Sequence, residues 1–363
     1  MSRGTRALRH HAGGFLAGLW MAALATGLAT PGVSAGTLLV VNKASDTVSL
    51  LDAETGRVLK TLPTGSHPHE VAISPDGRWA LVSNYGTDDD PGWTLTVIDV
   101  ENAREDGLID LAPHTRPHGV TWHPDGQRAL VTTEGSDSML IVDVRERRIL
   151  MEMATQGDGS HMVTIDPTGR RAYVASTQSG SVTGFDLERQ ERLGVTVTGV
   201  GAEGIAVRPD GEQVWVANRG AGTVSVLRGD DLSTLTTLRA EWSPARVGFT
   251  PDSRVALVTN TVSGSISVFD ARSLEHVRDF STRAGFGIQE GRLLGGLFGF
   301  MPMPIGMLIS EDGDSVYVAN TYAGRIGRYR ISDGERIEVL KSGEQPDGLG
   351  YSRITPAQDV ALP

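Results

Sequence analysis

Short runs of alternating apolar and polar residues recur along the chain, each followed by a tight polar turn. A period of two predicts a β-strand with one face buried, and the Pro-Asp-Gly type of sequence after each run predicts the turn. The runs are His69–Ser74, His118–His123, His161–Asp166, Glu203–Arg208, Ala245–Thr250 and Ile305–Ser310. The turns begin at Pro75, Pro124, Pro167, Pro209, Pro251 and Glu311, at intervals of 49, 43, 42, 42 and 60 residues.

The same order of strands follows every turn. A β-branched strand ends in Asn, Thr or Ser, as in Tyr317–Asn320, and the next strand usually ends in Asp, as in Ser265–Asp270. A period near 42 residues is typical of a four-stranded propeller blade, which cannot bury both of its faces alone. A closed ring of blades covers these faces. The sequence therefore predicts an all-β fold, a seven-bladed β-propeller.

The seventh blade is predicted to be split between the two ends of the chain. Its inner strand is Pro346–Ser352, and its other three strands are Leu38–Asn42, Thr47–Asp52 and Val58–Leu62. Pairing the two ends in one sheet would close the ring and leave no unpaired inner edge.

These repeats resemble the YVTN family of β-propeller repeats, which includes YncE-like periplasmic proteins. Tyr317-Val-Ala-Asn320 comes closest to the motif of the name, and Val214-Trp-Val-Ala-Asn218 is similar to it. The resemblance covers nearly all of residues 37–352. It implies the propeller fold and a periplasmic location, but no particular reaction, because members of this family mostly lack an assigned one.

The first 35 residues read as a secretory signal peptide. Arg3, Arg6 and Arg9 precede an apolar stretch, and a small-x-small sequence ends at Ala35. A membrane anchor is the alternative, although the apolar run is short and Gly-rich for a span of about 20 residues. We expect a mature domain of residues 36–363 that is periplasmic or secreted, with no membrane span after cleavage.

Composition narrows the possible partners. The chain has no Cys, which excludes disulfides and thiolate chemistry, and its formal net charge is −11. Removing residues 1–35 removes three Arg and no acid, leaving a charge of −14. A chain this acidic is not expected to bind nucleic acid or an anionic membrane.

Residues that could bind a metal ion occupy the position six residues before several of the turns. Four consecutive blades carry His69, His118, His161 and Glu203 there. His67 and His114 lie in the approaching loops. We expect these side chains around one mouth of the channel. Neutral imidazoles suit Cu or Zn, and Glu203 could be a fourth ligand or a general base. The alternative is that the histidines form hydrogen bonds between neighbouring blades.

An insertion of about residues 284–303 precedes blade six and enters the same face. Six Gly, several apolar residues and a Met-Pro-Met-Pro ending make it a candidate lid or partner-docking segment. The candidate contact residues are Phe286, Leu297, Phe298, Phe300, Met301 and Met303. Met301 and Met303 could also bind Cu(I), and a loop packed on its own blades is the alternative.

We find no Walker loop, Rossmann fingerprint in context, nucleophile elbow or His-Glu-x-x-His motif. The leading hypothesis is a periplasmic binding module for a protein or small-molecule ligand at the His-bearing face. A metal-dependent enzyme that uses Cu or Zn is the second, and an accessory protein of a periplasmic redox system is the third.

Overall fold

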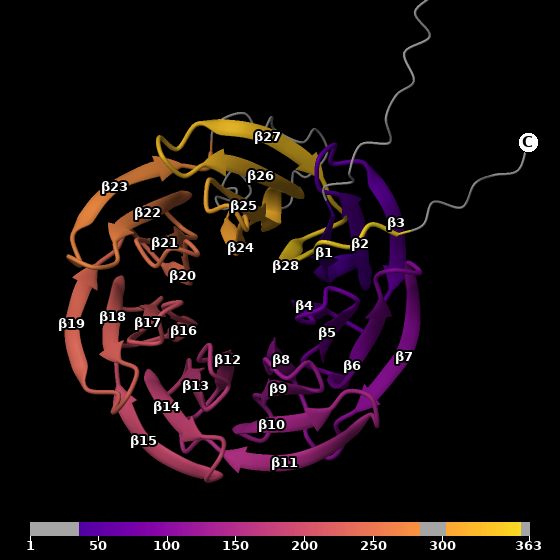
Figure 1. Ribbon diagram of the computed structural model, residues 1–363, viewed down its shortest axis with the longest axis horizontal. Coiled ribbons are helices and arrows are strands. Elements are labelled where there is room, and N and C mark those ends of the chain that lie inside the picture. The colour runs from indigo at the N-terminus through magenta and orange to yellow at the C-terminus, as the bar shows by residue number, and fades with distance from the viewer. Residues whose placement is uncertain (1–35, 284–302, 357–363) are drawn as a thin grey trace, which may run out of the picture. The chain divides into compact units, whose positions relative to one another are not determined.

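The computed structural model describes residues 36–283 and 303–356. These residues form seven four-stranded antiparallel sheets arranged around a central channel (Figure 1). Each blade has one strand nearest the channel (Figure 1). These inner strands are β4 (Pro68–Ile73), β8 (Pro117–Trp122), β12 (Ser160–Ile165), β16 (Ala202–Val207), β20 (Pro244–Phe249), β24 (Pro304–Ile309) and β28 (Pro346–Ser352). The predicted seven-bladed propeller is confirmed.

The second and third strands of each blade are almost wholly buried between neighbouring sheets. The second strands are β5 (Trp79–Gly86), β9 (Arg128–Thr133), β13 (Arg171–Ser176), β17 (Gln213–Asn218), β21 (Val255–Asn260), β25 (Ser315–Asn320) and β1 (Thr37–Asn42). The third strands are β6 (Pro91–Asp99), β10 (Ser138–Asp143), β14 (Ser181–Asp186), β18 (Thr223–Arg228), β22 (Ser265–Asp270), β26 (Arg325–Arg330) and β2 (Thr47–Asp52).

The fourth strands form the rim and alternate between exposed and half-buried residues. They are β7 (Arg104–Asp110), β11 (Arg148–Ala154), β15 (Glu191–Val197), β19 (Thr234–Arg239), β23 (His276–Ser281), β27 (Arg336–Lys341) and β3 (Val58–Pro63). Two short 3₁₀ turns, η1 (Lys43–Ser45) and η3 (Thr321–Ala323), follow second strands. None of the helices in the described ranges is long and apolar enough to cross a membrane.

The last sheet joins the two ends of the chain, as predicted. Its order is β28-β1-β2-β3, and β28 pairs antiparallel with β1, with Thr37 opposite Ser352. In Figure 1 the yellow C-terminal strand β28 lies beside the indigo strand β1. Lys43 N also donates to the carbonyl of Gln345.

The core is divided among the interfaces between blades. One cluster joins Leu81 and Leu95 of blade one (β4–β7) to Val131 and Leu140 of blade two (β8–β11), and each of the other interfaces has a similar cluster. Each sheet therefore obtains most of its apolar burial from its two neighbours, because a single sheet has no core of its own.

The turns have the conformation that their glycines predict. Gly77 has a φ of 78°, and Ser253, which stands where most blades have glycine, has a φ of 62°. Asn42, Asn84, Asn218 and Asn260 of the second strands bond to hydroxyls of the third strands, as when Asn84 Nδ2 donates to Thr96 Oγ1 over 3.0 Å, whereas Asn320 Nδ2 donates to the carbonyl of Val318. These Asn residues therefore have a structural role within their blades.

The expected signal peptide, residues 1–35, lies outside the described residues, as do Phe286, Leu297, Phe298, Phe300 and Met301 of the insertion. Met303 is described. It directly precedes β24, and its carbonyl accepts a hydrogen bond from Thr321 N.

Candidate functional site

Each inner strand is entered through a residue with a left-handed backbone, which places the following residues at the channel mouth. The φ values are 44° at His67, 58° at Arg116, 74° at Gly159, 74° at Gly201, 66° at Ser243, 48° at Met303 and 52° at Gln345. Glycine adopts this conformation without steric cost, whereas the other five residues do not. His67 therefore has a backbone role in the approach loop.

A β-bulge follows in each inner strand, at the residues that carry the candidate chemistry. In blade two Pro117 pairs with Thr133 and Val120 pairs with Val131, so His118 and Gly119 together lie opposite one residue, Thr132. A bulge of this kind redirects side chains out of the regular ladder. The inner-strand histidines therefore point into the channel instead of alternating strictly between the two neighbouring blades.

Hydroxyl groups of the second strands stabilise the bulges. Thr132 Oγ1 accepts a hydrogen bond from Gly119 N over 2.8 Å and donates to the carbonyl of His161 in the next blade over 2.6 Å. Ser83 makes the same pair of bonds, to Glu70 N and to the carbonyl of His118. These hydroxyls connect successive inner strands at the level of the histidines.

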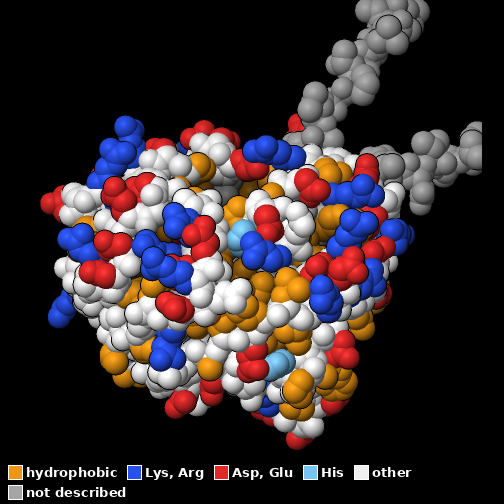
Figure 2. Space-filling model, turned by 60° about the horizontal axis from the view of Figure 1, so that its bottom comes forward, with side chains coloured by type: hydrophobic (Ala, Val, Ile, Leu, Met, Phe, Trp, Pro, Cys, Tyr) orange, Lys and Arg blue, Asp and Glu red, His pale blue; other side chains and the backbone are white. Residues whose placement is uncertain are grey.

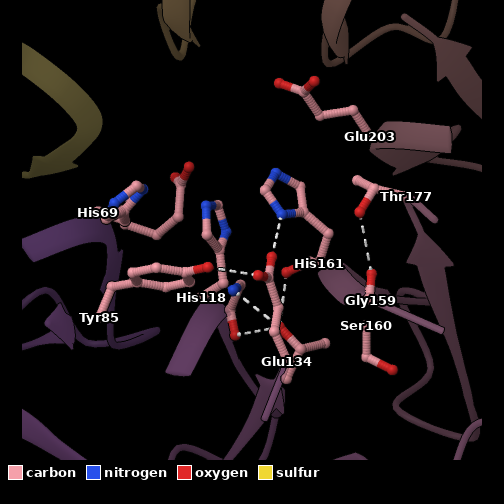
Figure 3. A network of polar contacts seen from close by, with 12 residues as sticks. His69, Tyr85, His118, Glu134, Gly159, Ser160, His161, Thr177 and Glu203 are labelled. Carbon is pink, nitrogen blue, oxygen red and sulfur yellow. Dashed lines mark hydrogen bonds and ion pairs between the residues drawn. The ribbon is translucent and has the colours of Figure 1, made fainter. Parts of the chain in front are cut away.

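The three predicted histidines form one continuous row. Ring centroids are 4.7 Å apart between His69 and His118 and 3.7 Å apart between His118 and His161. The row borders a cavity of about 800 Å³ at the channel mouth, to which blades one to five contribute side chains. Figure 3 shows the imidazoles of His118 and His161 side by side, with His69 beyond them.

Glu134 is the residue that the sequence interpretation missed. Its Oε1 accepts a hydrogen bond from His161 Nδ1 over 2.5 Å, and its Oε2 accepts one from the Tyr85 hydroxyl over 2.5 Å (Figure 3). His118, Glu134 and His161 each offer a ligand atom, and these atoms lie within 4.8 Å of one another. Among the described residues, these three form a compact cluster of possible metal ligands in the cavity.

A repeat signal for Glu134 was present in the sequence. It directly follows Thr133, the last residue of the second strand, and the corresponding residues of neighbouring blades are Tyr85, Thr177 and Arg219. All four line the cavity. The position after the recurrent Asn, Thr or Ser is therefore a second ring of channel-mouth residues.

Burial keeps two of the three imidazoles, those of His118 and His69, uncharged. It lowers the pKa of His118 well below the ordinary value, and the neighbouring His161 and His69 lower it further. Burial, followed by the charge of Lys43, likewise lowers the pKa of His69. Both imidazoles are therefore neutral at pH 7, which is the form that binds metal ions.

Hydrogen bonding determines the state of the carboxylate. Burial by itself raises the pKa of Glu134, but hydrogen bonds from His161 and Tyr85 outweigh this effect and hold it below its ordinary value. Burial and the bond to Glu134 raise the pKa of Tyr85 to about 12. At neutral pH the network is therefore a phenol and an imidazole N–H that both donate to one carboxylate.

Glu203, the fourth predicted ligand, also lines the cavity but has cationic partners. Its Oε2 is 3.0 Å from Arg219 Nη1, and its Oε1 is 3.3 Å from Arg246 Nη1. The buried Arg246 also reaches Glu70 of blade one over 2.5 Å. Since Arg246 belongs to blade five, this ion pair crosses the channel. Burial lowers the pKa of Arg246, but Glu70 and Glu203 outweigh this and raise it.

The corresponding position of the split blade holds Asp347, which is 2% exposed. Its Oδ2 is 3.5 Å from His69 Nδ1 and 3.7 Å from Lys43 Nζ. Two positions, Ala245 and Ile305, are apolar. His114, the other histidine of the approach loops, is bonded to Ser136 Oγ through Nδ1 over 2.9 Å. At this inner-strand position, the polar side chains therefore come from blade seven and blades one to four.

The fold and the site define a seven-bladed β-propeller with an imidazole-lined channel mouth. Residues 96–275, just under half of the chain, match the family model described as lactonase, 7-bladed beta-propeller, so the chain is similar to this family over those residues. The matched residues include His118, Glu134, His161 and Glu203, and they exclude His69.

Two solved structures share the fold. A functionally unknown protein from Desulfotomaculum acetoxidans DSM 771 is 17% identical, with a TM-score of 0.71, over 89% of this chain and 100% of that one. Hydrazine synthase of Kuenenia stuttgartiensis is 18% identical, with a TM-score of 0.65, over 84% of this chain and 94% of that one. No curated protein matches the sequence. At these identities the likeness concerns the fold alone.

Proposed function

We propose that this protein is an exported binding module of the YncE-like type and that its channel mouth binds a divalent transition metal ion, Cu²⁺ or Zn²⁺. The observation that carries the proposal is the close approach of His118, His161 and Glu134, which brings two imidazole donors and one carboxylate within 4.8 Å of one another. The sequence of residues 1–35 supports export.

The donor set fits such an ion. Zn²⁺ bound to imidazoles would need ligand atoms about 3.4 Å apart. The candidate ligand atoms lie within 4.8 Å of one another, so side-chain rotations would be needed to complete the site. His118 is 2% exposed, and its Nδ1 has no hydrogen-bond partner among the described residues. An unpaired buried imidazole nitrogen is costly without a ligand.

We assign Glu134 a positioning role. By accepting a hydrogen bond from His161 Nδ1–H, it leaves the lone pair of that imidazole on Nε2 as a metal donor. Tyr85 holds the second carboxylate oxygen of Glu134. His69 lies beside His118 as a third imidazole donor, whereas Glu203 is engaged by two guanidinium groups.

Calorimetric titration of chelator-treated protein with ZnCl₂ and CuCl₂ tests the proposal. We expect one site per chain, with affinity reduced at least about tenfold in His118→Ala and His161→Ala, and reduced by about 10- to 100-fold in Glu134→Gln. His276→Ala is the matched control, because His276 lies on the rim strand β23 and pairs with Asp279. Unchanged affinity in the double variant of His118 and His161 would overturn the assignment.

Hydrolysis of a lactone is a second candidate. The matching family is described as lactonase, and the Tyr85–Glu134–His161 chain of hydrogen bonds is favourable for a general base whose Nε2 is free to accept a proton. Acid release from dihydrocoumarin, measured with and without zinc, tests this role. The lactonase role requires that the parent releases acid, that His161→Ala does not, and that His276→Ala does.

A further inference from the structure

The cavity wall opposite the histidines has a different chemistry. Blades four and five contribute Arg219, Trp242 and Val262 to it, together with Gly201 and Gly220, which have no side chains. This wall therefore combines one guanidinium group with apolar surface and exposed backbone. Figure 2 shows basic and acidic side chains interspersed over the face in view.

Trp242 is presented to solvent on an ordered loop. It is 74% exposed, although aromatic side chains of this size usually bury most of their surface. Its backbone N donates to Ser263 Oγ over 2.8 Å, and its carbonyl accepts from Ser263 N over 3.3 Å. The backbone that carries the indole is therefore fixed at the cavity. This arrangement lowers the entropy lost when a planar ligand packs on it.

Arg219 is held beside this indole. Its Nε donates to Oγ of Ser243, the neighbour of Trp242, over 3.2 Å, and its Nη1 donates to Glu203 over 3.0 Å. The side chain is 41% exposed, and within the part of the chain that the structure describes Nη2 has no hydrogen-bond partner.

Arg219 is the more exposed of the two guanidinium groups that contact Glu203. The other, Arg246, is buried and also pairs with Glu70. A guanidinium with a fixed plane and Nη2 without a partner among the described residues is suited to donate a charge-assisted hydrogen bond to a carboxylate.

We propose that this wall binds a small aromatic carboxylate, with its carboxylate on Arg219 and its ring against Trp242 and Val262. A cavity of about 800 Å³ accommodates such a molecule. The inference goes beyond the metal-binding function, because this subsite needs no metal ion.

Benzoate is the probe for a test on the full chain, treated with chelator and followed by calorimetry and tryptophan fluorescence. We expect benzoate to bind and to change the fluorescence. Benzamide, which has the ring without the charge, and acetate, which has the charge without the ring, should each bind at least about tenfold more weakly.

Two variants assign the binding to this wall. Arg219→Gln and Trp242→Ala should each weaken benzoate binding at least about tenfold. Trp93→Ala, which removes an indole that is 46% exposed on β6, should leave it unchanged. Equal affinity for benzoate and benzamide, or unchanged benzoate binding in Arg219→Gln, would overturn the inference.

The same titrations separate this inference from the metal site. His118→Ala should lose zinc binding while keeping benzoate binding, because the two walls use different residues. If the parent bound benzoate but not zinc, the result would count against the proposed function. If the parent bound zinc but not benzoate, the result would count against the carboxylate subsite.

Discussion

The three channel histidines occupy equivalent repeat positions but have different partners. His69 lies against Asp347 of the split blade, His118 lies between two other imidazoles, and His161 donates to Glu134. His118 has the least access to water of the three, since its residue is 2% exposed. Its protonation therefore has the largest structural cost.

Acid should destabilise the protein through His118. Its pKa in the folded state lies well below the ordinary value of 6.5, so in the interval between them the unfolded chain binds a proton that the folded chain excludes. The stabilisation is present above about pH 6.5 and is lost as the pH falls towards the folded-state pKa. The free energy of unfolding of chelator-treated protein, measured in urea at pH 7.5 and 5.5, should fall more in the parent than in His118→Gln.

Other titrating groups cancel in this comparison, including Glu70, whose pKa burial raises. His276→Gln removes an exposed histidine and should show the same acid sensitivity as the parent. An equal loss of stability in the parent and in His118→Gln would contradict the expected effect.

At the scale of single elements, the bulge in each inner strand brings that strand close to the next one. In blade two, Gly119 is the second residue of the bulge, and a Cβ there would lie 2.8 Å from three backbone atoms of His161, Met162 and Val163. The glycine therefore sets the spacing between the strands that carry His118 and His161.

Gly119→Ala should destabilise the protein by about 1–3 kcal/mol, because backbone atoms must move to make room for the methyl group. It should also weaken zinc binding by displacing the two histidines. Gly194→Ala, on the rim strand β15, is the matched control, since a Cβ there meets no atom within 4 Å. Urea denaturation and zinc titration of both variants check the prediction, and equal behaviour would contradict it.

At the scale of the whole molecule, stability depends on closure of the ring. β28 pairs with β1, and the cluster between blade six and the split blade includes Leu349 of β28 together with Leu38 and Tyr317. Each blade obtains its burial from its neighbours, so opening one interface exposes two sheet faces.

A chain that ends before Pro346 should lose cooperative unfolding or aggregate, because β1 would become an unpaired edge beside an exposed apolar face. A chain that ends at Pro356 keeps β28 and serves as the control. Thermal unfolding followed by circular dichroism, together with light scattering, measures both. If the shorter chain unfolded as cooperatively as the control, β28 would not be needed for closure.

The sequence by itself determined the propeller, the split blade and the common level of His69, His118 and His161. These features follow from a repeat of short strands and turns, in which equivalent positions occupy equivalent places around the ring. The same comparison of equivalent positions could have revealed Glu134, which follows the recurrent Asn, Thr or Ser of a second strand as Tyr85 does.

Only the tertiary structure decided how these residues are paired. Glu134 bonds to His161 and Asp347 lies against His69, whereas Glu203 is engaged by Arg219 and Arg246. The ion pair between Arg246 and Glu70 joins residues 176 positions apart on opposite sides of the channel. A local repeat cannot encode such contacts, because they depend on the bulges that redirect inner-strand side chains and on the blades that face one another after the ring has closed.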